Sequence, residues 1–169
     1  MQTKQHIHLL VLTALFAAAI AATTAYVLHI PLPTGGYIHV GDALIYLAAC
    51  LLPTPWAVAA GAVGGSLADL LTAPMWAPAT LVVKALICLP FTSSQPTVLT
   101  GHNALAVVLA GLLSPTLYGC FNVLLARSWA AFLPQFIGTL IQALGSAAVF
   151  FVLALACDRA GLKQRLERL

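Results

Sequence analysis

Long apolar segments, broken by Pro and Gly and almost free of charge, make up the chain from Ile7 to Cys157. Only 7% of the 169 residues are charged and 62% are hydrophobic, whereas a soluble domain carries roughly 25% charged residues. Backbone polar groups that face lipid must be hydrogen-bonded within the chain, which favours helices for apolar segments of this kind. We therefore expect an all-α membrane protein that forms a single transmembrane domain over residues 1–169.

The breaks between the apolar segments predict a six-helix transmembrane bundle. Several segments are shorter than the roughly 20 residues that usually cross a bilayer. A bundle of four spans would need the Pro-broken segments to pair into long helices. The six expected spans cover residues of about 7–28, 38–52, 56–71, 77–89, 104–125 and 134–157.

Basic residues at both ends of the chain predict the topology. Lys4 precedes the first span, and Arg159, Lys163, Arg165 and Arg168 follow the last one. Because cytoplasmic segments carry an excess of Lys and Arg, we expect both termini to be cytoplasmic and the number of spans to be even. The loops at residues 30–38, 72–76 and 126–133 are then external.

Three charged residues, Asp42, Asp69 and Lys84, lie inside predicted spans. A charge at bilayer depth is costly and indicates a functional site or a buried pair. The predicted topology puts all three in the outer half of the membrane, where we expect a buried charge network. One interpretation is an ion pair of Lys84 with Asp69 or Asp42 that holds three short helices together. Direct ligand contact and a proton relay are the alternatives.

Polar residues recur at helical spacing in the carboxyl-terminal half. Tyr118 and Asn122 are four residues apart in the fifth span, and Gln135, Thr139 and Gln142 form one stripe on the sixth. Such a stripe must face protein or water. It either joins helices through hydrogen bonds or binds a polar heterocycle, because neutral hydrogen-bonding groups beside aromatic rings suit that kind of ligand.

No catalytic or cofactor motif occurs in the sequence. The histidines His6, His8, His29, His39 and His102 lack H-E-x-x-H spacing, and there is no G-x-x-x-x-G-K-[ST] motif. A weak metal site at His29 and His39, which bracket the first external loop, is the remaining alternative. The net charge of +3 is small and scattered. We therefore expect neither an enzyme nor a protein that binds nucleic acid, a metal or a cofactor.

The first span carries two rows of small residues. Ala14, Ala18 and Ala22 are spaced four apart, and Ala17, Ala21 and Ala25 form a second row. Small residues at this spacing let helices approach closely in lipid. Packing within the protein and packing against a partner both fit this pattern.

Three motifs in the first half resemble those of a known family. The chain has GYIHVGDA over residues 36–43, GAVGGSLAD over 61–69 and APATLVVK over 77–84. They resemble the motifs of substrate-binding S components of energy-coupling factor (ECF) transporters, most closely the riboflavin-transporter-like group. Tyr118-Gly119 and Thr139-Leu-Ile-Gln142 resemble that group's later motifs. The chain departs from the group at Ala85, where Gly is usual, and at Thr139, where Asn is usual.

The resemblance implies six helices, no enzymatic activity, and a water-soluble vitamin held near the external face beneath the first external loop. It also implies two cytoplasmic ATPase subunits and a membrane coupling subunit, in the plasma membrane of a prokaryotic cell. Small residues on the first helix would dock the coupling subunit, here Ala14 and Ala18 in the row with Ala22. We expect the ligand to contact Tyr37, His39, Tyr118, Asn122, Gln135 and Gln142.

Two other functions fit the same residues. One is a stand-alone, ion-coupled secondary transporter of a small polar solute, and the other is a membrane scaffold or enzyme subunit without transport activity. The ligand also stays open at this point. A flavin, a pyrimidine or pyridine vitamin precursor, and biotin all suit neutral polar groups beside aromatic rings.

Overall fold

The structure is a computed structural model, and it describes residues 2–27, 29–31 and 37–166. Helices dominate, and a single pair of two-residue strands, β1 (Ile30–Pro31) and β2 (Tyr37–Ile38), forms an antiparallel hairpin within this part of the chain. The helices are α1 (Gln2–Tyr26), α2 (Asp42–Leu51), α3 (Thr54–Thr72), α4 (Ala77–Cys88), α5 (Gly101–Ala126), α6 (Phe132–Arg159) and α7 (Leu162–Leu166), with short 3₁₀ helices η1 (Pro74–Trp76) and η2 (Trp129–Ala131).

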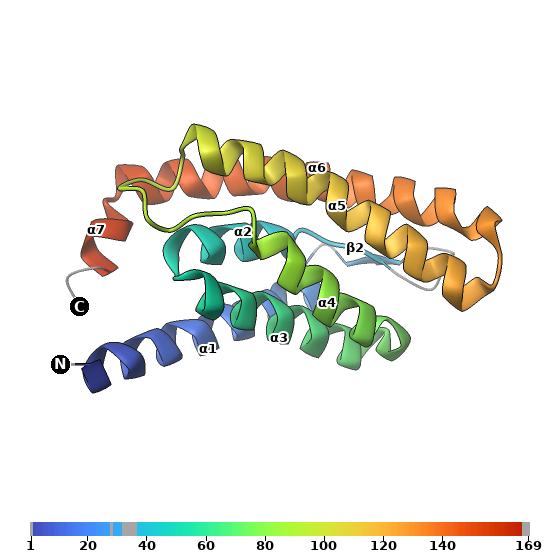
Figure 1. Ribbon diagram of the computed structural model, residues 1–169, viewed down its shortest axis with the longest axis horizontal. Coiled ribbons are helices and arrows are strands. Elements are labelled where there is room, and N and C mark those ends of the chain that lie inside the picture. The colour runs from blue at the N-terminus through green and yellow to red at the C-terminus, as the bar shows by residue number, and fades with distance from the viewer. Residues whose placement is uncertain (1, 28, 32–36, 167–169) are drawn as a thin grey trace.

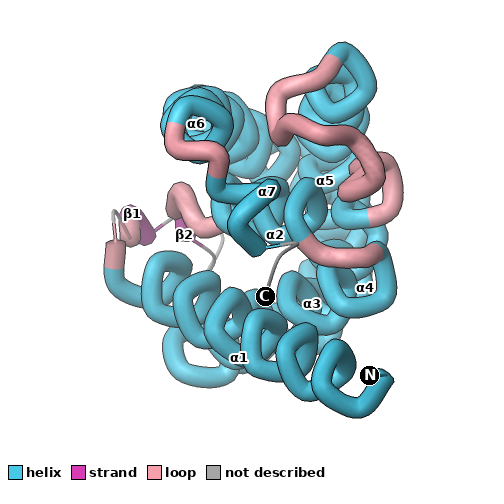
Figure 2. Tube along the Cα trace, turned by 90° about the vertical axis from the view of Figure 1, so that its left-hand side faces the viewer, coloured by secondary structure: helices cyan, strands magenta, loops and turns pink. Residues whose placement is uncertain are grey.

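The helices form two groups with α2 between them. Figure 1 shows α5 and α6 side by side along one edge, and α1 with α3 along the other. Helix α4 packs on α3 and also contacts α5. Seen end-on in Figure 2, α7 and α2 lie between the two groups, and the hairpin lies at the side between α1 and α6. The N- and C-terminal ends of the described chain lie at the same end of the molecule, which fits an even number of crossings.

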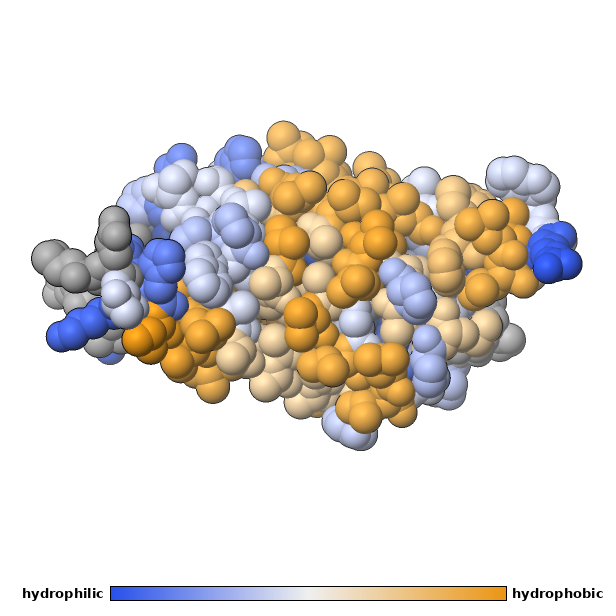
Figure 3. Space-filling view, turned by 60° about the horizontal axis from the view of Figure 1, so that its bottom comes forward, coloured by the Kyte–Doolittle hydropathy of each residue, from blue (hydrophilic) through white to orange (hydrophobic). Residues whose placement is uncertain are grey.

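Three helical segments in the described residues are long and apolar enough to cross a membrane: Thr3–Tyr26, Gly101–Ala126 and Trp129–Arg159. Helices α2 and α4 are apolar but have only 10 and 12 residues. At 1.5 Å per residue, α2 rises about 15 Å, half the thickness of a hydrocarbon core. Figure 3 shows apolar residues over the middle of one face and hydrophilic ones at the end with the termini.

The second helix begins later than its sequence pattern predicts. The predicted span starts at residue 38, but Tyr37 and Ile38 pair with Pro31 and Ile30 as strands, so α2 starts at Asp42. The paired backbone groups are therefore unavailable to a helix. Residues 32–36, which include most of the expected loop over the site and Gly36 of the first motif, lie outside the described residues, as do Leu28 and Arg168.

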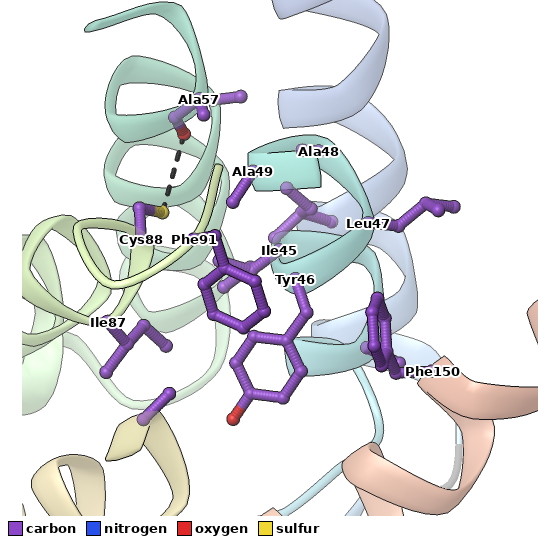
Figure 4. Packing of buried hydrophobic residues seen from close by; sticks show 14 of the residues in the cluster. Ile45, Tyr46, Leu47, Ala48, Ala49, Ala57, Ile87, Cys88, Phe91 and Phe150 are labelled. Atoms are coloured by element: carbon purple, nitrogen blue, oxygen red, sulfur yellow. Dashed lines mark hydrogen bonds between the residues drawn. The ribbon is translucent and has the colours of Figure 1, made fainter. Parts of the chain in front are cut away.

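Helix α2 forms the centre of the hydrophobic core. Eight of its residues are buried, as expected of a helix that is apolar on all sides. Figure 4 shows the ring of Tyr46 between those of Phe91 and Phe150. The Tyr46 and Phe91 rings stack with centroids 5.1 Å apart, and the Phe150 ring meets Tyr46 edge-on at 5.9 Å. The core thus joins α2 to α6 and to the segment after α4.

Helices α1 and α3 approach each other closely at Gly64. A Cβ atom at this position would lie 2.7 Å from the Ala17 carbonyl oxygen and 2.9 Å from the Ile20 Cβ. Ala17 and Ile20 are buried here. The absence of a side chain therefore sets the distance between the two helices. Gly61 and Gly65, which have the G-x-x-x-G spacing, instead face side chains of α2 and α4.

We expect Gly64→Ala to destabilise the protein by about 1–3 kcal/mol, because the added methyl meets backbone rather than a flexible side chain. The matched control is Gly145→Ala on α6, where an added Cβ has nothing within 4 Å. Higher helix propensity should leave that control as stable as the wild type or more so. Melting temperatures of the three purified proteins test this, and equal destabilisation by both substitutions would contradict it.

Candidate functional site

A small polar cavity lies between the two helix groups, toward the end of the molecule opposite the termini. Its volume is about 30 Å³, roughly the space of one water molecule. Residues from the hairpin and from helices α3 to α6 meet at this cavity. Its wall consists of Tyr37, His39, Asp69, Trp76, Thr80, Tyr118, Gln135, Thr139 and Gln142.

Asp69, near the end of α3, accepts hydrogen bonds from two hydroxyl groups. Tyr37 Oη donates to one carboxylate oxygen and Thr80 Oγ1 to the other. Tyr118 Oη lies 2.6 Å from Thr80 Oγ1. Because the single Thr80 proton goes to Asp69, Tyr118 donates to Thr80. The hairpin and helices α3, α4 and α5 are thereby joined by one chain of hydrogen bonds.

Burial and the neighbouring Asp69 carboxylate raise the pKa of Tyr37 well above its ordinary value. Tyr37 lies on β2, between helices α1 and α2, and its ring stacks on that of His29 with centroids 3.9 Å apart. The phenol therefore stays protonated and remains a donor to Asp69 across the physiological pH range.

Lys84 pairs with Asp42, which resolves the two pairings that the sequence left open. Lys84 Nζ lies 2.6 Å from Asp42 Oδ1, and both side chains are 1% exposed. Gln142 Nε2 donates to Asp42 Oδ2 at 3.2 Å. The Lys84 ammonium also lies 5.3 Å from the centroid of the Tyr118 ring, a cation–π distance. This second cluster joins α2, α4 and α6, and neither charge lines the cavity.

His39 lies on the short connection between β2 and α2 and is buried. Its Nδ1 accepts a hydrogen bond from the Gly41 N–H at 2.9 Å, so the ring proton of the neutral histidine is on Nε2. A Cβ atom at Gly41 would overlap Thr24 Oγ1 on α1. This crowding explains the glycine of the Gly41-Asp42-Ala43 motif.

We expect acid to destabilise the protein through His39. Burial lowers the pKa of His39 from 6.5 to about 3, with Lys84 and His29 lowering it further and Asp42 opposing them. Between these two pH values the unfolded chain binds a proton at this ring and the folded chain does not. Each pH unit below 6.5 should therefore remove up to about 1.4 kcal/mol of stability.

Melting temperatures of wild type and His39→Asn between pH 7.5 and pH 4 test this expectation. Asparagine keeps an acceptor for the Gly41 N–H but does not titrate. The stability that is lost when carboxylates take up protons in acid is the same in both proteins. The wild type should lose more stability than the variant, and parallel curves would contradict the assignment.

The stripe on α6 meets the cavity as its spacing indicates. Gln135, Thr139 and Gln142 are each about 5% exposed or less and all line the wall. Gln135 Nε2 donates to Thr139 Oγ1 at 3.2 Å. The Gln135 Oε1 atom is buried and has no hydrogen-bond partner in the part of the chain that the structure describes. A buried acceptor of this kind costs about 1–3 kcal/mol when it is left unsatisfied.

Five of the six residues that we expected to touch a ligand line the cavity, and Asn122 does not. Asn122 Nδ2 instead donates to the Ala131 carbonyl at 3.0 Å, so its amide holds the connection between α5 and α6. Sequence reasoning did not select Trp76 and Thr80 as contacts. Thr80 precedes Lys84 by one helical turn, which could have indicated it, but nothing in the sequence distinguished Trp76 from an interfacial tryptophan.

The two alanine rows of α1 face different surroundings. Ala17 and Ala25 are buried, Ala17 against α3. Ala14, Ala18 and Ala22 are exposed. The second row therefore serves packing within the protein, while the first remains open on the surface.

Metal binding finds no support among the residues that the structure describes. No group of three or more His, Cys, Asp or Glu side chains is placed to hold an ion. His29 stacks on Tyr37, and His39 Nδ1 is engaged by the Gly41 amide. The cavity instead offers hydroxyl, amide and carboxylate groups beside aromatic rings, which suits a small neutral polar molecule.

The chain is similar to a known protein family and, over part of its length, to a protein of known sequence. Residues 4–159 match the family model described as "ECF-type riboflavin transporter, S component". A protein of Pyrococcus woesei, described as "Uncharacterized protein in gap 3'region", is 43% identical over 67 residues. That segment makes up 39% of this chain and 45% of the relative, so the match spans less than half the length of either.

Proposed function

Since the chain belongs to the family of ECF-type riboflavin transporter S components, which are membrane transport subunits rather than enzymes, we propose that it is the high-affinity binding subunit for a water-soluble vitamin or vitamin precursor. The bound molecule is a flavin or a similar heterocycle, and the cavity beside Asp69 and Gln135 is the binding site. The protein holds the ligand through hydrogen bonds and aromatic contacts and does not change it chemically.

The observation that carries this proposal is the orphaned Gln135 Oε1 in the cavity wall. An N–H group of a heterocycle would satisfy this acceptor and remove the penalty of leaving it unpaired. Trp76, Tyr118 and Tyr37 supply aromatic faces or edges around the same cavity. A planar ring with polar edges fits these groups better than an anionic solute, because the buried Lys84 ammonium is already paired with Asp42 and the charged group in the wall is the Asp69 carboxylate.

The cavity must open for such a ligand to enter. Sites for small molecules usually measure roughly 300–1,000 Å³, and this one measures about 30 Å³. We expect the hairpin to move, because its strands have only two residues each and Tyr37 on it lines the cavity. Opening the cavity would break the hydrogen bond from Tyr37 to Asp69, which joins the hairpin to α3. Ligand binding then replaces the Tyr37–Asp69 contact or shifts it, and the closed arrangement is the ligand-free state.

The proposed topology has six spans with both termini in the cytoplasm of a prokaryotic cell. The short helices α2, α3 and α4 share the crossing with the longer α1, α5 and α6. A membrane coupling subunit docks on the exposed row of Ala14, Ala18 and Ala22, and two cytoplasmic ATPase subunits supply the energy. The exposure of this row, which contrasts with the buried row beside it, supports the assignment.

Uptake of radiolabelled riboflavin by cells that lack their own uptake system tests the proposal. We expect uptake only when the coupling subunit and both ATPases are produced with this protein, and we expect Ala18→Phe to abolish it without weakening riboflavin binding. Uptake by this protein alone would instead favour an ion-coupled secondary transporter. Failure of the purified protein to bind any vitamin would contradict the proposed binding subunit and favour a membrane scaffold without transport activity.

A further inference from the structure

The Asp69 carboxylate has acceptor positions that the protein does not fill. A carboxylate offers about four such positions on its two oxygens, and the hydroxyl groups of Tyr37 and Thr80 take two of them. Asp69 is 5% exposed and lines the polar cavity. Within the part of the chain that the structure describes, Lys84 pairs with Asp42 and not with Asp69. Because a buried carboxylate is costly unless its oxygens are hydrogen-bonded, the open positions favour donor groups from a ligand.

The hydroxyl and amide donors of the cavity wall, in contrast, are used inside the protein. Each of the side chains that donate a hydrogen bond in the wall gives it to another protein atom, and these side chains are Tyr37, Thr80, Tyr118, Gln135 and Gln142. The Gln135 Oε1 atom is a second open acceptor beside those of Asp69. The wall therefore offers acceptors to a ligand more than it offers donors, and it suits a molecule rich in N–H and O–H groups.

The two open acceptors come from different helix groups. Asp69 belongs to α3 and Gln135 to α6, and these helices run along opposite edges of the molecule (Figure 1). A ligand that satisfies both acceptors must carry donors at two separate places. A ring N–H group and the hydroxyl groups of a side chain meet this requirement together, whereas a flat ring alone would leave the open positions of Asp69 unfilled.

We propose that Asp69 determines the specificity of the site for a heterocycle with an uncharged, hydroxylated side chain. The hydroxyl groups of that chain donate to the Asp69 carboxylate, and a ring N–H donates to Gln135. This inference rests on the proposed function, because it assigns the two ends of a ligand within the same cavity.

The same arrangement excludes a phosphorylated form of the ligand. A phosphate group brings negative charge and acceptor oxygens to a wall whose open positions are themselves acceptors, and like charges in contact are unfavourable. No lysine or arginine lines the cavity among the described residues. His39 is neutral, because burial lowers its pKa to about 3. The wall therefore holds no cation that could compensate a phosphate.

Three flavins with the same ring system test this. They are riboflavin, lumiflavin, in which a methyl group replaces the hydroxylated chain, and riboflavin 5′-phosphate. Fluorescence titration of the purified full-length protein gives the three affinities. Lumiflavin should bind roughly 10- to 100-fold more weakly than riboflavin, because it lacks the hydrogen bonds to a charged group. The phosphate should bind more weakly by about 50-fold, the effect of one like charge about 7 Å away at the effective dielectric constant of a protein.

Asp69→Asn separates recognition by the carboxylate from a structural role. The variant keeps an acceptor oxygen and loses the charge, so the preference for riboflavin over its phosphate should fall by about the same factor of 50. Its affinity for lumiflavin should match that of the wild type, whereas a purely structural effect would weaken all three flavins alike. The matched control is Asp158→Asn in the last turns of α6, which removes the same charge outside the cavity wall and should keep the wild-type ratios.

The affinity ratios of the wild type need no substitution, so they decide the question even if Asp69→Asn does not fold. Equal affinity for riboflavin and lumiflavin, or for riboflavin and its phosphate, would overturn the role of Asp69. The proposed function would still stand if Trp76→Ala weakened riboflavin binding. Tighter binding of the cationic vitamin thiamin than of any flavin would also overturn this role, because the carboxylate would then pair with a cation. Failure of all three flavins to bind would contradict a flavin site in this cavity and this inference with it.

Discussion

Lys84→Ala should destabilise the protein by about 3–5 kcal/mol, because it leaves the Asp42 carboxylate buried with Gln142 as its remaining partner. Asp42 and Lys84 are each 1% exposed in the side chain, so water cannot replace the lost ammonium group. A loss of this size is a large part of the 5–15 kcal/mol that typical domains have. We expect a low yield of folded protein and a strongly lowered melting temperature.

A double substitution separates the cost of the unpaired charge from that of the lost packing. Lys84→Met with Asp42→Asn removes both charges and keeps a partner for Gln142, so it should be more stable than Lys84→Ala alone. Lys4→Ala, which removes a charge from an exposed position, should melt like the wild type. If the effects of Lys84→Met and Asp42→Asn simply add, the two side chains do not form the coupled pair described above.

Trp76→Ala should weaken riboflavin binding by about 30-fold, on the order of 2 kcal/mol, because it removes the largest aromatic surface of the cavity wall. Trp76 is 3% exposed and lies edge-on to Tyr118, with ring centroids 6.0 Å apart. A flavin ring in this cavity must lie against one or both. Fluorescence titration of the purified variant with riboflavin gives the affinity.

The matched control is Trp129→Ala on η2, toward the same end of the molecule. Trp129 is 79% exposed and does not line the cavity, so its removal should leave riboflavin affinity unchanged. Melting temperatures of both variants distinguish a lost contact from a lost fold. Equal affinity in Trp76→Ala and the wild type would mean that the ligand lies elsewhere.

The buried charges show how far sequence reasoning reaches. Hydropathy predicts that Asp42, Asp69 and Lys84 lie inside apolar segments, and the cost of an isolated charge predicts that Lys84 has a partner. The choice of Asp42 over Asp69 depends on hydroxyl groups from Tyr37 and Thr80, which occupy both oxygens of Asp69. These contacts join residues 11 and 32 positions apart, and no local pattern indicates them.

Tyr118 and Asn122 show a second limit of sequence reasoning. The i, i+4 spacing of Tyr118 and Asn122 correctly indicates a shared buried face, since both are less than 9% exposed. The depth of each along that face decides its role, and Asn122 lies level with the η2 turn, where its amide finds the Ala131 carbonyl. Helical spacing predicts faces well, but it carries no information on which loop closes over a face. Helical spacing likewise does not predict the hairpin, whose strand pairing moves the start of α2 to Asp42.

The most direct test of the proposed function is the stoichiometry of riboflavin binding to the purified wild-type protein, measured by isothermal titration with biotin and a charged amino acid as comparison ligands. We predict one riboflavin per chain, with Trp76→Ala and Gln135→Leu both weakening it and Trp129→Ala leaving it unchanged. Binding of none of these ligands, or riboflavin binding that is insensitive to both cavity substitutions, would contradict a vitamin site in this cavity.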